Sequence, residues 1–370
     1  MRTRVIVFIA VVQSLLLLVH GFVYLTWIDF SAGSDPPGDS KLAVLAVILL
    51  AVSFVAATLA ALRWTHRLVR LFYTISAAWA GTVNFCFLAA CGCWVVYGAL
   101  ALAGFRAERQ PLAEALFGLA LLVSAYGMVN AAKPRVKTVT VNLPNLPASW
   151  RGRVAALVTD THLGPLRNER FARRIARRIA KFQPDILFLG GDVYDGGAAD
   201  LGRLAAPWGE IKPPLGAYFV TGNHEEFTGR GKYLDAITRA GIRVLDNEKV
   251  VLEGLQIVGV HYRDSADPRR FRAILRRAAL DRGKASVLLS HAPHGLRIAE
   301  EEGIALQLSG HTHGGQMFPF TWITRRIYGR FTYGLQRLGS LASYTSCGAG
   351  TWGPPLRVGT KPEIVLLRFQ

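Results

Sequence analysis

The chain has 370 residues, of which 51% are apolar, and its formal net charge is +18. That length allows two domains, and the apolar share is high for a soluble protein. A disulfide framework and a cysteine-based zinc knuckle are excluded, because the chain holds four cysteines and three of them, Cys86, Cys91 and Cys93, share one apolar stretch far from Cys347.

Four long apolar stretches precede Lys133. They run from Val5 to Ile28, from Leu42 to Leu62, from Leu71 to Phe105 and from Ala115 to Ala132. A helix that spans a bilayer needs about 20 apolar residues, so the first, second and fourth stretches each fit one span. The third is too long for one span, and we expect an interfacial turn at Thr74 to Ala80 followed by a span near Gly81 to Ala103. Residues 1–133 are therefore predicted to form an all-α bundle of four transmembrane helices, and residues 134–370 a separate domain.

The charged residues beside these stretches predict their orientation. Basic residues flank the N-terminus, the second loop and the end of the last stretch, namely Arg2, Arg4, Arg63, Arg67, Arg70, Lys133, Arg135 and Lys137. The first loop is acidic, with Asp29, Asp35 and Asp39, and the third loop is mixed. Because basic loops tend to stay inside the cell, we predict a multi-pass membrane protein with both ends, and the second domain, in the cytoplasm.

After Pro134 the apolar runs become short and are separated by turn residues. The strand-like runs are "VKTVTV", "RVAALV", "DILFLG", "GAYFV", "ASVLL" and "ALQLS", and "VVLEGLQIVGVHY" predicts a hairpin. Helix-like stretches separate most of them. Strands that alternate with helices predict a layered α/β domain, in which ligands bind at the carboxyl ends of the strands.

Two of the helix-like stretches are strongly basic. In "LRNERFARRIARRIAKF" the apolar residues Phe171, Ile175, Ile179 and Phe182 recur at helical spacing, and "PRRFRAILRRAALDRGK" repeats the pattern. Each basic face is either a solvated surface or a surface in contact with lipid. The part after residue 137 has a net charge of +12, which attracts anionic lipid headgroups, phosphate-bearing substrates and nucleic acid alike.

Polar residues follow five of the predicted strands. They are Asp160 and His162, then Asp192, then Asn223 and His224, then His291, then His311 and His313. Carboxylate, imidazole and amide oxygen are ligands suited to divalent manganese, iron, zinc or nickel. His311 and His313 are one residue apart and would point the same way from an extended backbone. The set predicts a centre of two divalent metal ions, with one aspartate as the bridge.

The ordered motifs "DTH", "GDVYD", "GNHEE", "SH" and "GHTH" resemble those of the calcineurin-like metallophosphoesterase superfamily. The resemblance covers roughly residues 137–370, and the stretches "GHTHGGQMFPF" and "GAGTWGPPLRVGTKPEIVLLRF" are similar to its membrane-linked branch, the transmembrane proteins with a metallophosphoesterase domain. The resemblance implies an α/β fold, a four-layer α/β/β/α sandwich. The strand pattern by itself also allows a simple doubly wound sheet.

The resemblance also implies a role for each candidate residue. One metal would be held by Asp160, His162, Asp192 and His313, and the other by Asp192, Asn223, His291 and His311. His224 would contact the scissile phosphate and protonate the leaving oxygen, after in-line attack by a hydroxide that bridges the two ions. We expect Asp195 to orient a ligand. His261, His294 and Cys347 match no ligand of the family and are interpreted as structural.

The predicted function is that of a membrane-anchored, dinuclear metal-dependent phosphoesterase that hydrolyses phosphoester or pyrophosphate bonds. A lipid-linked substrate is favoured, since some relatives of the branch act on nucleotide-linked acylated sugars, and "MFPFTWITRRIYGRFTYGL" mixes aromatic and basic residues as membrane interfaces do. The same segment could instead be a folded surface loop. The alternatives are a phosphodiesterase or phosphatase for soluble substrates, and an inactive membrane sensor or scaffold. A nuclease is favoured by charge alone, and no dedicated nucleic-acid binding is expected.

Overall fold

The computed structural model describes residues 2–31, 41–197, 199–227 and 229–370. Its contacts divide the chain into two compact units. One comprises Met1–Val129 with Gly353–Leu356, and the other Asn130–Trp352 with Arg357–Gln370. Asp35 and Asp39, on which the predicted orientation partly depends, lie outside the described residues.

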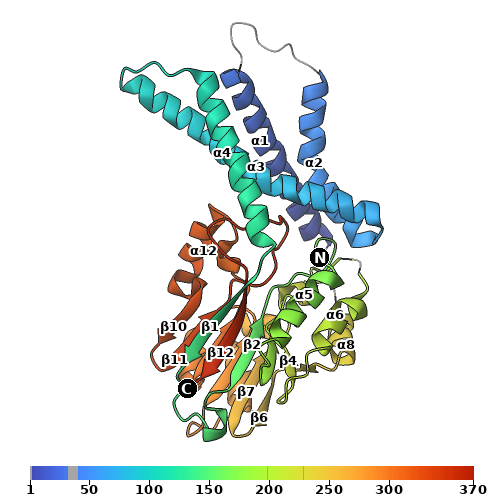
Figure 1. Cartoon of the computed structure of the whole chain (residues 1–370), viewed down its shortest axis with the longest axis vertical. Helices are drawn as coiled ribbons and strands as arrows, with labels where there is room; N and C mark the ends of the chain where they lie inside the picture. Colours follow the sequence, from blue (N-terminus) through green and yellow to red (C-terminus); the bar gives the residue numbers. More distant parts are fainter. Residues whose placement is uncertain (1, 32–40, 198, 228) are drawn as a thin grey trace. The chain divides into compact units, whose positions relative to one another are not determined.

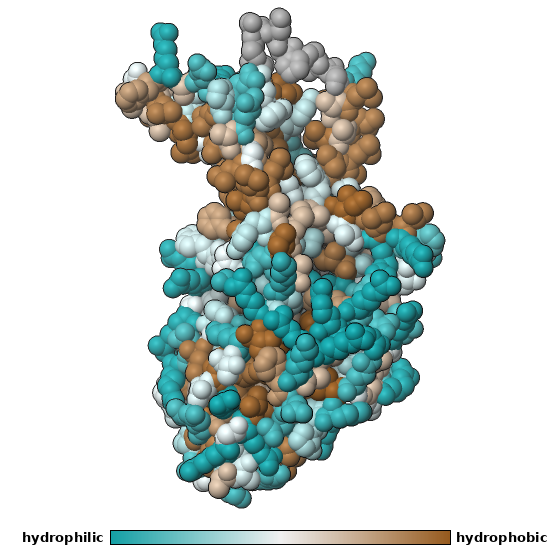
Figure 2. All heavy atoms as spheres, in the orientation of Figure 1, coloured by the Kyte–Doolittle hydropathy of each residue, from teal (hydrophilic) through white to brown (hydrophobic). Residues whose placement is uncertain are grey.

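Four long apolar helices occupy the described part of the chain before residue 132 (Figure 1). They are α1 (Arg2–Ser31), α2 (Lys41–Arg63), α3 (Arg67–Leu102) and α4 (Arg109–Ala131), and each is long and apolar enough to cross a membrane. Large apolar side chains point away from them, and Leu18, Val95 and Leu122 are each 70% exposed. Figure 2 shows hydrophobic side chains over these helices. A helix that is apolar all round is suited to lipid rather than to water.

The predicted interfacial turn at Thr74 to Ala80 is wrong. α3 runs without a break from Arg67 to Leu102 and passes through this segment. The sequence there, "TISAAWA", contains neither proline nor glycine and is rich in alanine, so nothing in it interrupts the helical hydrogen bonds. At 1.5 Å per residue the 36 residues of α3 extend for about 54 Å, well beyond a hydrocarbon core of about 30 Å.

The described residues of the second unit form two six-stranded sheets. The first has the order β1 (Arg135–Val141), β12 (Glu363–Phe369), β2 (Val154–Val158), β3 (Ile186–Leu189), β4 (Ala217–Phe219) and β5 (Arg243–Val244). The second has the order β10 (Gly334–Leu338), β11 (Leu341–Thr345), β9 (Leu306–Ser309), β8 (Ser286–Ser290), β7 (Leu255–Val260) and β6 (Glu248–Leu252). The predicted hairpin is the antiparallel pair of β6 and β7. Both sheets are mixed.

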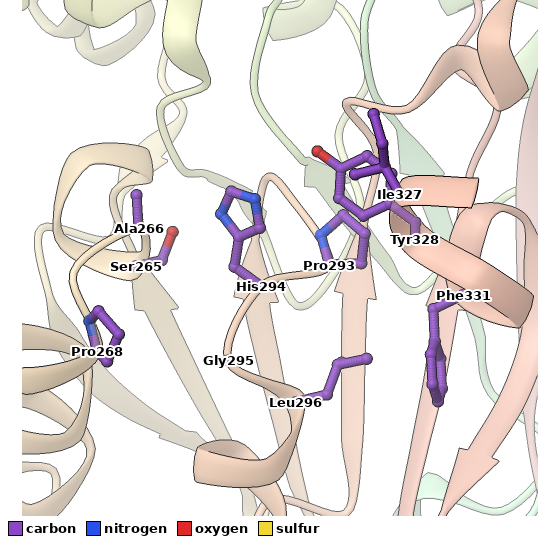
Figure 3. Close-up of a pocket in the computed structure, with 10 residues that line it drawn as sticks. All are labelled: Ser265, Ala266, Pro268, Pro293, His294, Gly295, Leu296, Ile327, Tyr328 and Phe331. Atoms are coloured by element: carbon purple, nitrogen blue, oxygen red, sulfur yellow. The ribbon is translucent and has the colours of Figure 1, made fainter. Parts of the chain in front are cut away.

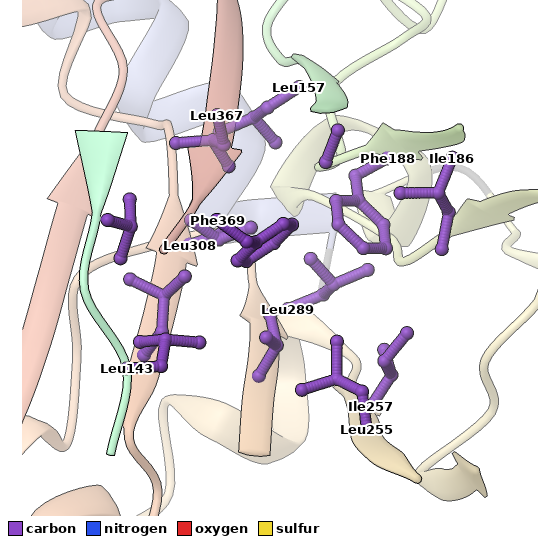
Figure 4. Close-up of a cluster of buried hydrophobic side chains, with 14 of the residues drawn as sticks. Leu143, Leu157, Ile186, Phe188, Leu255, Ile257, Leu289, Leu308, Leu367 and Phe369 are labelled. Atoms are coloured by element: carbon purple, nitrogen blue, oxygen red, sulfur yellow. The ribbon is translucent and has the colours of Figure 1, made fainter. Parts of the chain in front are cut away.

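Three clusters of buried side chains show that these elements form four layers. The central cluster joins the facing sides of the two sheets and includes Phe188, Leu289, Leu308 and Phe369 (Figure 4). A second cluster packs α5 (Glu169–Ala180), α6 (Leu201–Gly209) and α8 (Gly231–Arg239) on the outer face of the first sheet. A third packs α10 (Pro268–Arg277) and α11 (Leu296–Glu301) on the second sheet. The four-layer sandwich implied by the resemblance is confirmed, and the simple doubly wound sheet is wrong.

The remaining elements are short and lie mostly in the loops. They are η1 (Ala148–Trp150), α7 (Asn223–Phe227), α9 (Tyr262–Ser265), η2 (His313–Gly315), α12 (Phe320–Tyr328) and η3 (Gly329–Thr332). The basic helix α5 buries Phe171, Ile175 and Ile179 as its spacing predicts, whereas Phe182 follows the helix and is 46% exposed. Part of its basic face is paired within the domain, because Arg173 contacts Glu169 and Glu210.

Candidate functional site

The predicted site residues lie on loops that leave the carboxyl ends of neighbouring strands. Strands β2, β3 and β4 are parallel to one another in the first sheet, and β8 and β9 are parallel in the second. The loops carry Asp160 and His162 after β2, Asp192 after β3, Asn223 and His224 after β4, His291 after β8, and His311 and His313 after β9. Because parallel strands end at the same edge, this topology gathers residues that are far apart in the chain.

The first donor group consists of Asp160, His162 and His313, all buried. Nε2 of His162 lies 3.0 Å from Nε2 of His313, and the latter lies 3.5 Å from Oδ1 of Asp160. Ligand atoms that each lie about 2.1 Å from one cation come within about 3 to 4 Å of one another. The three side chains therefore have the chemistry and the spacing of a site for a divalent cation.

The second donor group consists of Asp192, His291 and His311, with Asn223 beside it. Nε2 of His291 lies 3.2 Å from Oδ2 of Asp192, and Nδ1 of His311 lies 2.9 Å from Oδ1 of Asn223. Nδ1 of His291 is bonded to the backbone oxygen of Gly190 at 2.8 Å, so this nitrogen carries the proton. Such a bond leaves Nε2 free to act as a ligand.

His224 and Asp195 lie beside the first group. Nδ1 of His224 is 3.3 Å from the backbone oxygen of Asp195, and its backbone N–H donates to Oδ1 of Asp192 at 2.9 Å. Oδ1 of Asp195 also lies 3.3 Å from Nδ1 of His162. Asp195 thus contacts two of the imidazoles and can orient both. His162, Asp192 and His224 are themselves close enough to hold a cation, so their distances alone do not separate a catalytic from a ligating His224.

Five of the predicted ligands have a left-handed backbone. They are Asp160, His162, Asp192, His311 and His313, with φ between 47° and 69°, and they are among eleven such non-glycine residues in the described part of the chain. This conformation is unfavourable for residues with a Cβ, and strain of this kind concentrates at functional sites. The extended backbone expected for His311 and His313 is wrong. The tight left-handed turn sends the two imidazoles to different donor groups.

Two glycines allow the loops to approach this closely. A Cβ at Gly222 would collide with Oδ1 of Asp192, and a Cβ at Gly310 would collide with Oδ2 of Asp160. Gly222 directly precedes Asn223, and Gly310 directly precedes His311. The absence of a side chain at these positions is therefore required for the two aspartates to take their places.

The electrostatics of the site favour positive charge at its centre. Burial acts to raise the pKa of Asp192, but the imidazoles of His291 and His224 outweigh it and hold that pKa well below its ordinary value. Burial acts to lower the pKa of His291, but the carboxylates of Asp192 and Asp160 raise it to about 10. Burial raises the pKa of Asp160. Burial and the charge on His291 lower the pKa of His311 to about 3, which keeps that imidazole neutral, as a ligand must be.

The residues present fit a metal centre. Nε2 of His291 is fully buried and has no hydrogen-bond partner among the described residues. That nitrogen lies 3.2 Å from Oδ2 of Asp192, and a cation bound there would replace the proton that the two carboxylates favour on the imidazole. The donor set contains imidazole, carboxylate and amide oxygen, in agreement with the divalent ions expected from the sequence.

Two buried residues with structural roles in the site were not predicted. Glu225 accepts hydrogen bonds from the backbone N–H groups of Asp192, Tyr194 and Gly222, and burial together with Asp192 raises its pKa to about 7. The sequence feature that could have identified Glu225 is its position next to His224 in "GNHEE". Arg357 is fully buried and bonds Nδ1 and the backbone oxygen of His313. No local pattern marks it, because its partner among the predicted ligands, His313, is 44 residues away in the chain.

His261 and Cys347, which the sequence analysis interprets as structural, make contacts that connect neighbouring loops. Nε2 of His261 lies 2.8 Å from Oδ1 of Asp246, and Nδ1 lies 3.0 Å from the hydroxyl of Thr221. Cys347 is buried, and its backbone oxygen accepts from Arg357 at 2.6 Å. These contacts hold loops behind the donor groups in place.

Comparison with known proteins agrees with this geometry. The family model for calcineurin-like phosphoesterases matches residues 154–315. An uncharacterized metallophosphoesterase of Campylobacter jejuni is 33% identical over 282 residues, which cover 73% of this chain and 74% of that protein. Another from Aquifex aeolicus is 34% identical over 263 residues, or 68% of this chain and 98% of that protein. A transmembrane protein with metallophosphoesterase domain from Danio rerio is 32% identical over 306 residues, or 75% of this chain and 68% of that protein. The chain belongs to the calcineurin-like metallophosphoesterases and is a phosphoric ester hydrolase.

Proposed function

We propose that this protein is a multi-pass membrane enzyme that hydrolyses phosphoester or pyrophosphate bonds of a lipid-linked substrate with two divalent metal ions. The observation that carries the proposal is the pair of donor groups at one edge of the sandwich, with Tyr328 of the exposed helix α12 only 6.3 Å from the ring of His311. A nucleotide-linked acylated sugar is one substrate of this chemistry.

Seven residues would hold the two ions. Asp160, His162 and His313 would bind one, Asn223, His291 and His311 the other, and Asp192 would contact both. A pair of cations bound there supplies positive charge that polarises the phosphoryl oxygens and acidifies water. Manganese, iron, zinc and nickel all accept this set of donors.

The chain's own residues would orient the reaction. The contact between Nδ1 of His224 and the backbone oxygen of Asp195 fixes the imidazole ring and leaves Nε2 to face the substrate. From that nitrogen a proton can reach the leaving oxygen. Glu225 supports this arrangement, because it holds the backbone at Asp192 and Gly222 through hydrogen bonds of 3.0 and 2.7 Å.

The surface of α12 supports a substrate embedded in lipid. All residues of α12 belong to the described part of the chain, and none of them is buried. Most of its exposed side chains are apolar. They include Phe320, Trp322, Ile323 and Ile327, with exposed fractions of 46%, 57%, 41% and 69%. Arg325 and Arg326 lie among them, and the Arg326 guanidinium is 5.0 Å from the centre of the Trp322 ring. Aromatic and basic residues together are typical of helices that lie at the surface of an anionic bilayer.

The four apolar helices would keep this domain at a membrane. The basic residues Lys133, Arg135 and Lys137 after α4 favour the cytoplasmic side. We therefore place the catalytic domain at the inner leaflet, where its net positive charge would attract anionic headgroups.

The purified full-length protein in lipid nanodiscs tests the proposal. With manganese present, turnover of a phosphoester incorporated in the bilayer should exceed that of bis(p-nitrophenyl) phosphate at matched concentration. Equal rates for both substrates in detergent would count against a lipid-linked substrate. Asn223→Ala and His224→Ala should each abolish turnover, whereas an inactive scaffold would show no turnover to lose.

A further inference from the structure

A cavity of about 490 Å³ opens beside the second donor group. The side chains that line it come from α12 and η3 on one side, and from the end of α9, the start of α10, the loop after His291 and α11 on the other. Its wall is largely apolar, with Pro268, Leu296, Ile327 and Phe331, and it also includes His294 and Tyr328 (Figure 3). A concave, mainly apolar site with few polar groups is suited to a small molecule.

Ring contacts connect this cavity to the second donor group. The Tyr328 ring lies 6.2 Å from the ring of His294 and 6.3 Å from the ring of His311. The rings of His294 and His311 are 6.2 Å apart. One wall of the cavity is therefore also the boundary of the proposed metal centre, so a substrate with its phosphate at the metals could extend an attached group into the cavity.

His224, which lies beside the first donor group, has different neighbours. The His224 ring contacts the rings of His162, Phe227 and Trp352 at 4.7, 5.6 and 6.3 Å. Phe227 and Trp352 are 68% and 58% exposed, and neither lines the cavity. A leaving oxygen that takes its proton from His224 must lie beside these rings. The group attached to that oxygen therefore lies away from the cavity.

We propose that the cavity binds the apolar substituent that remains on phosphorus, in a diester or pyrophosphate with a hydrocarbon on the retained side. This assignment rests on the proposed function, and on the role of His224 in particular. Water adds to phosphorus, the bond from phosphorus to the leaving oxygen breaks, and the leaving oxygen takes a proton. The retained substituent stays bonded to the phosphate of the product.

A series of diesters with one leaving group tests the proposal in the full-length protein in detergent. Methyl, butyl and hexyl p-nitrophenyl phosphate differ only in the retained group. Each methylene that enters the cavity should lower KM by up to about fourfold. Ile327 and Ala266 both line the cavity; Ile327→Gln makes its wall more polar and Ala266→Trp fills it. Both changes should remove most of the preference for hexyl over methyl. Val251→Gln, a change of an exposed side chain on β6, should leave that preference as in the wild type.

Calorimetric titration with methylphosphonate and hexylphosphonate provides a second readout that needs no turnover. The wild type should bind hexylphosphonate more tightly, and Ile327→Gln should lose that advantage while Val251→Gln keeps it. Equal KM values across the diesters, or a hexyl preference that survives both cavity variants, would overturn the assignment. Failure of the proposed function would give a different result. The wild type would then cleave none of the diesters with manganese, iron, zinc or nickel. The phosphonate titration would still show whether the cavity binds the hexyl group.

Discussion

Nε2 of His162 and Nε2 of His313 face each other at 3.0 Å, although the two residues are 151 positions apart in the chain. Two neutral imidazoles cannot both present lone pairs to each other at this distance without repulsion. Either a cation between the two nitrogens or a proton on Nε2 of His313, which the Arg357 guanidinium at Nδ1 favours, removes the repulsion, and the nearby Asp160 carboxylate attracts both.

The His162–His313 pair leads to a prediction about metal content. His313→Ala should lower the bound divalent metal from two ions per chain towards one, since the donor group around His291 keeps all its ligands. Mass spectrometry of metals in the purified protein measures this directly. His66→Ala, which changes an exposed histidine before α3, is the matched control and should keep both ions. Two ions retained by His313→Ala would show that this residue is not a ligand.

Gly222 provides a test of the close approach between loops. Gly222→Ala places a Cβ against Oδ1 of Asp192 and should displace that carboxylate. A displacement of about 1 Å at a catalytic group costs on the order of a hundredfold in kcat/KM. Hydrolysis of bis(p-nitrophenyl) phosphate measures the loss. Gly202→Ala in α6, where a Cβ has room, should remain near wild-type activity, and a fully active Gly222→Ala would contradict the geometry.

Arg357 should be important for stability as well as for the site. Its guanidinium donates to the backbone oxygens of Cys347, Gly350 and His313, all buried with it. Arg357→Leu leaves these acceptors unpaired, at about 1 to 3 kcal/mol for each. We expect a clear fall in the thermal unfolding midpoint, and a smaller fall for Arg357→Lys, which keeps the charge but not the planar fork. Arg368→Leu on the exposed side of β12 is the control.

The fold was predictable where the chain shows regular patterns. The apolar runs before the ligand motifs are strands β2, β3, β4, β8 and β9, and the hairpin of β6 and β7 was also visible. Strand β12 was not identified as a strand, although it pairs with both β1 and β2. Its partners lie more than 200 residues earlier in the chain, and pairing over such a separation leaves no local signal.

The candidate site was predictable in its residues but not in its local conformation. Motif order placed Asp160, Asp192 and His291 at strand ends, and the structure brings them together. The left-handed backbone at His311 and His313 was missed, because a spacing of two residues indicates a shared direction only when the chain is extended. Arg357 was missed for another reason, since its role depends on contacts that only the folded chain creates.

The exposed face of α12 gives a prediction about substrate location. Replacing Phe320 and Trp322 by glutamine removes apolar surface that would otherwise enter the bilayer, at about 1.5 to 3 kcal/mol per side chain. The ratio of lipid-ester turnover to bis(p-nitrophenyl) phosphate turnover in nanodiscs should fall at least several-fold. Val251→Gln should leave the ratio unchanged. An unaltered ratio in the double variant would mean that α12 is an ordinary surface helix.

The most direct test of the central claim combines metal analysis with activity. The wild-type protein is stripped with a chelator, reloaded with manganese, iron, zinc or nickel, and measured for bound metal and for phosphodiester hydrolysis in the same sample. The structure predicts no activity in the stripped protein, and activity that rises as binding approaches two ions per chain. Full activity without metal, or saturation at fewer than two ions with no hydrolysis, would contradict a dinuclear centre built from these loops.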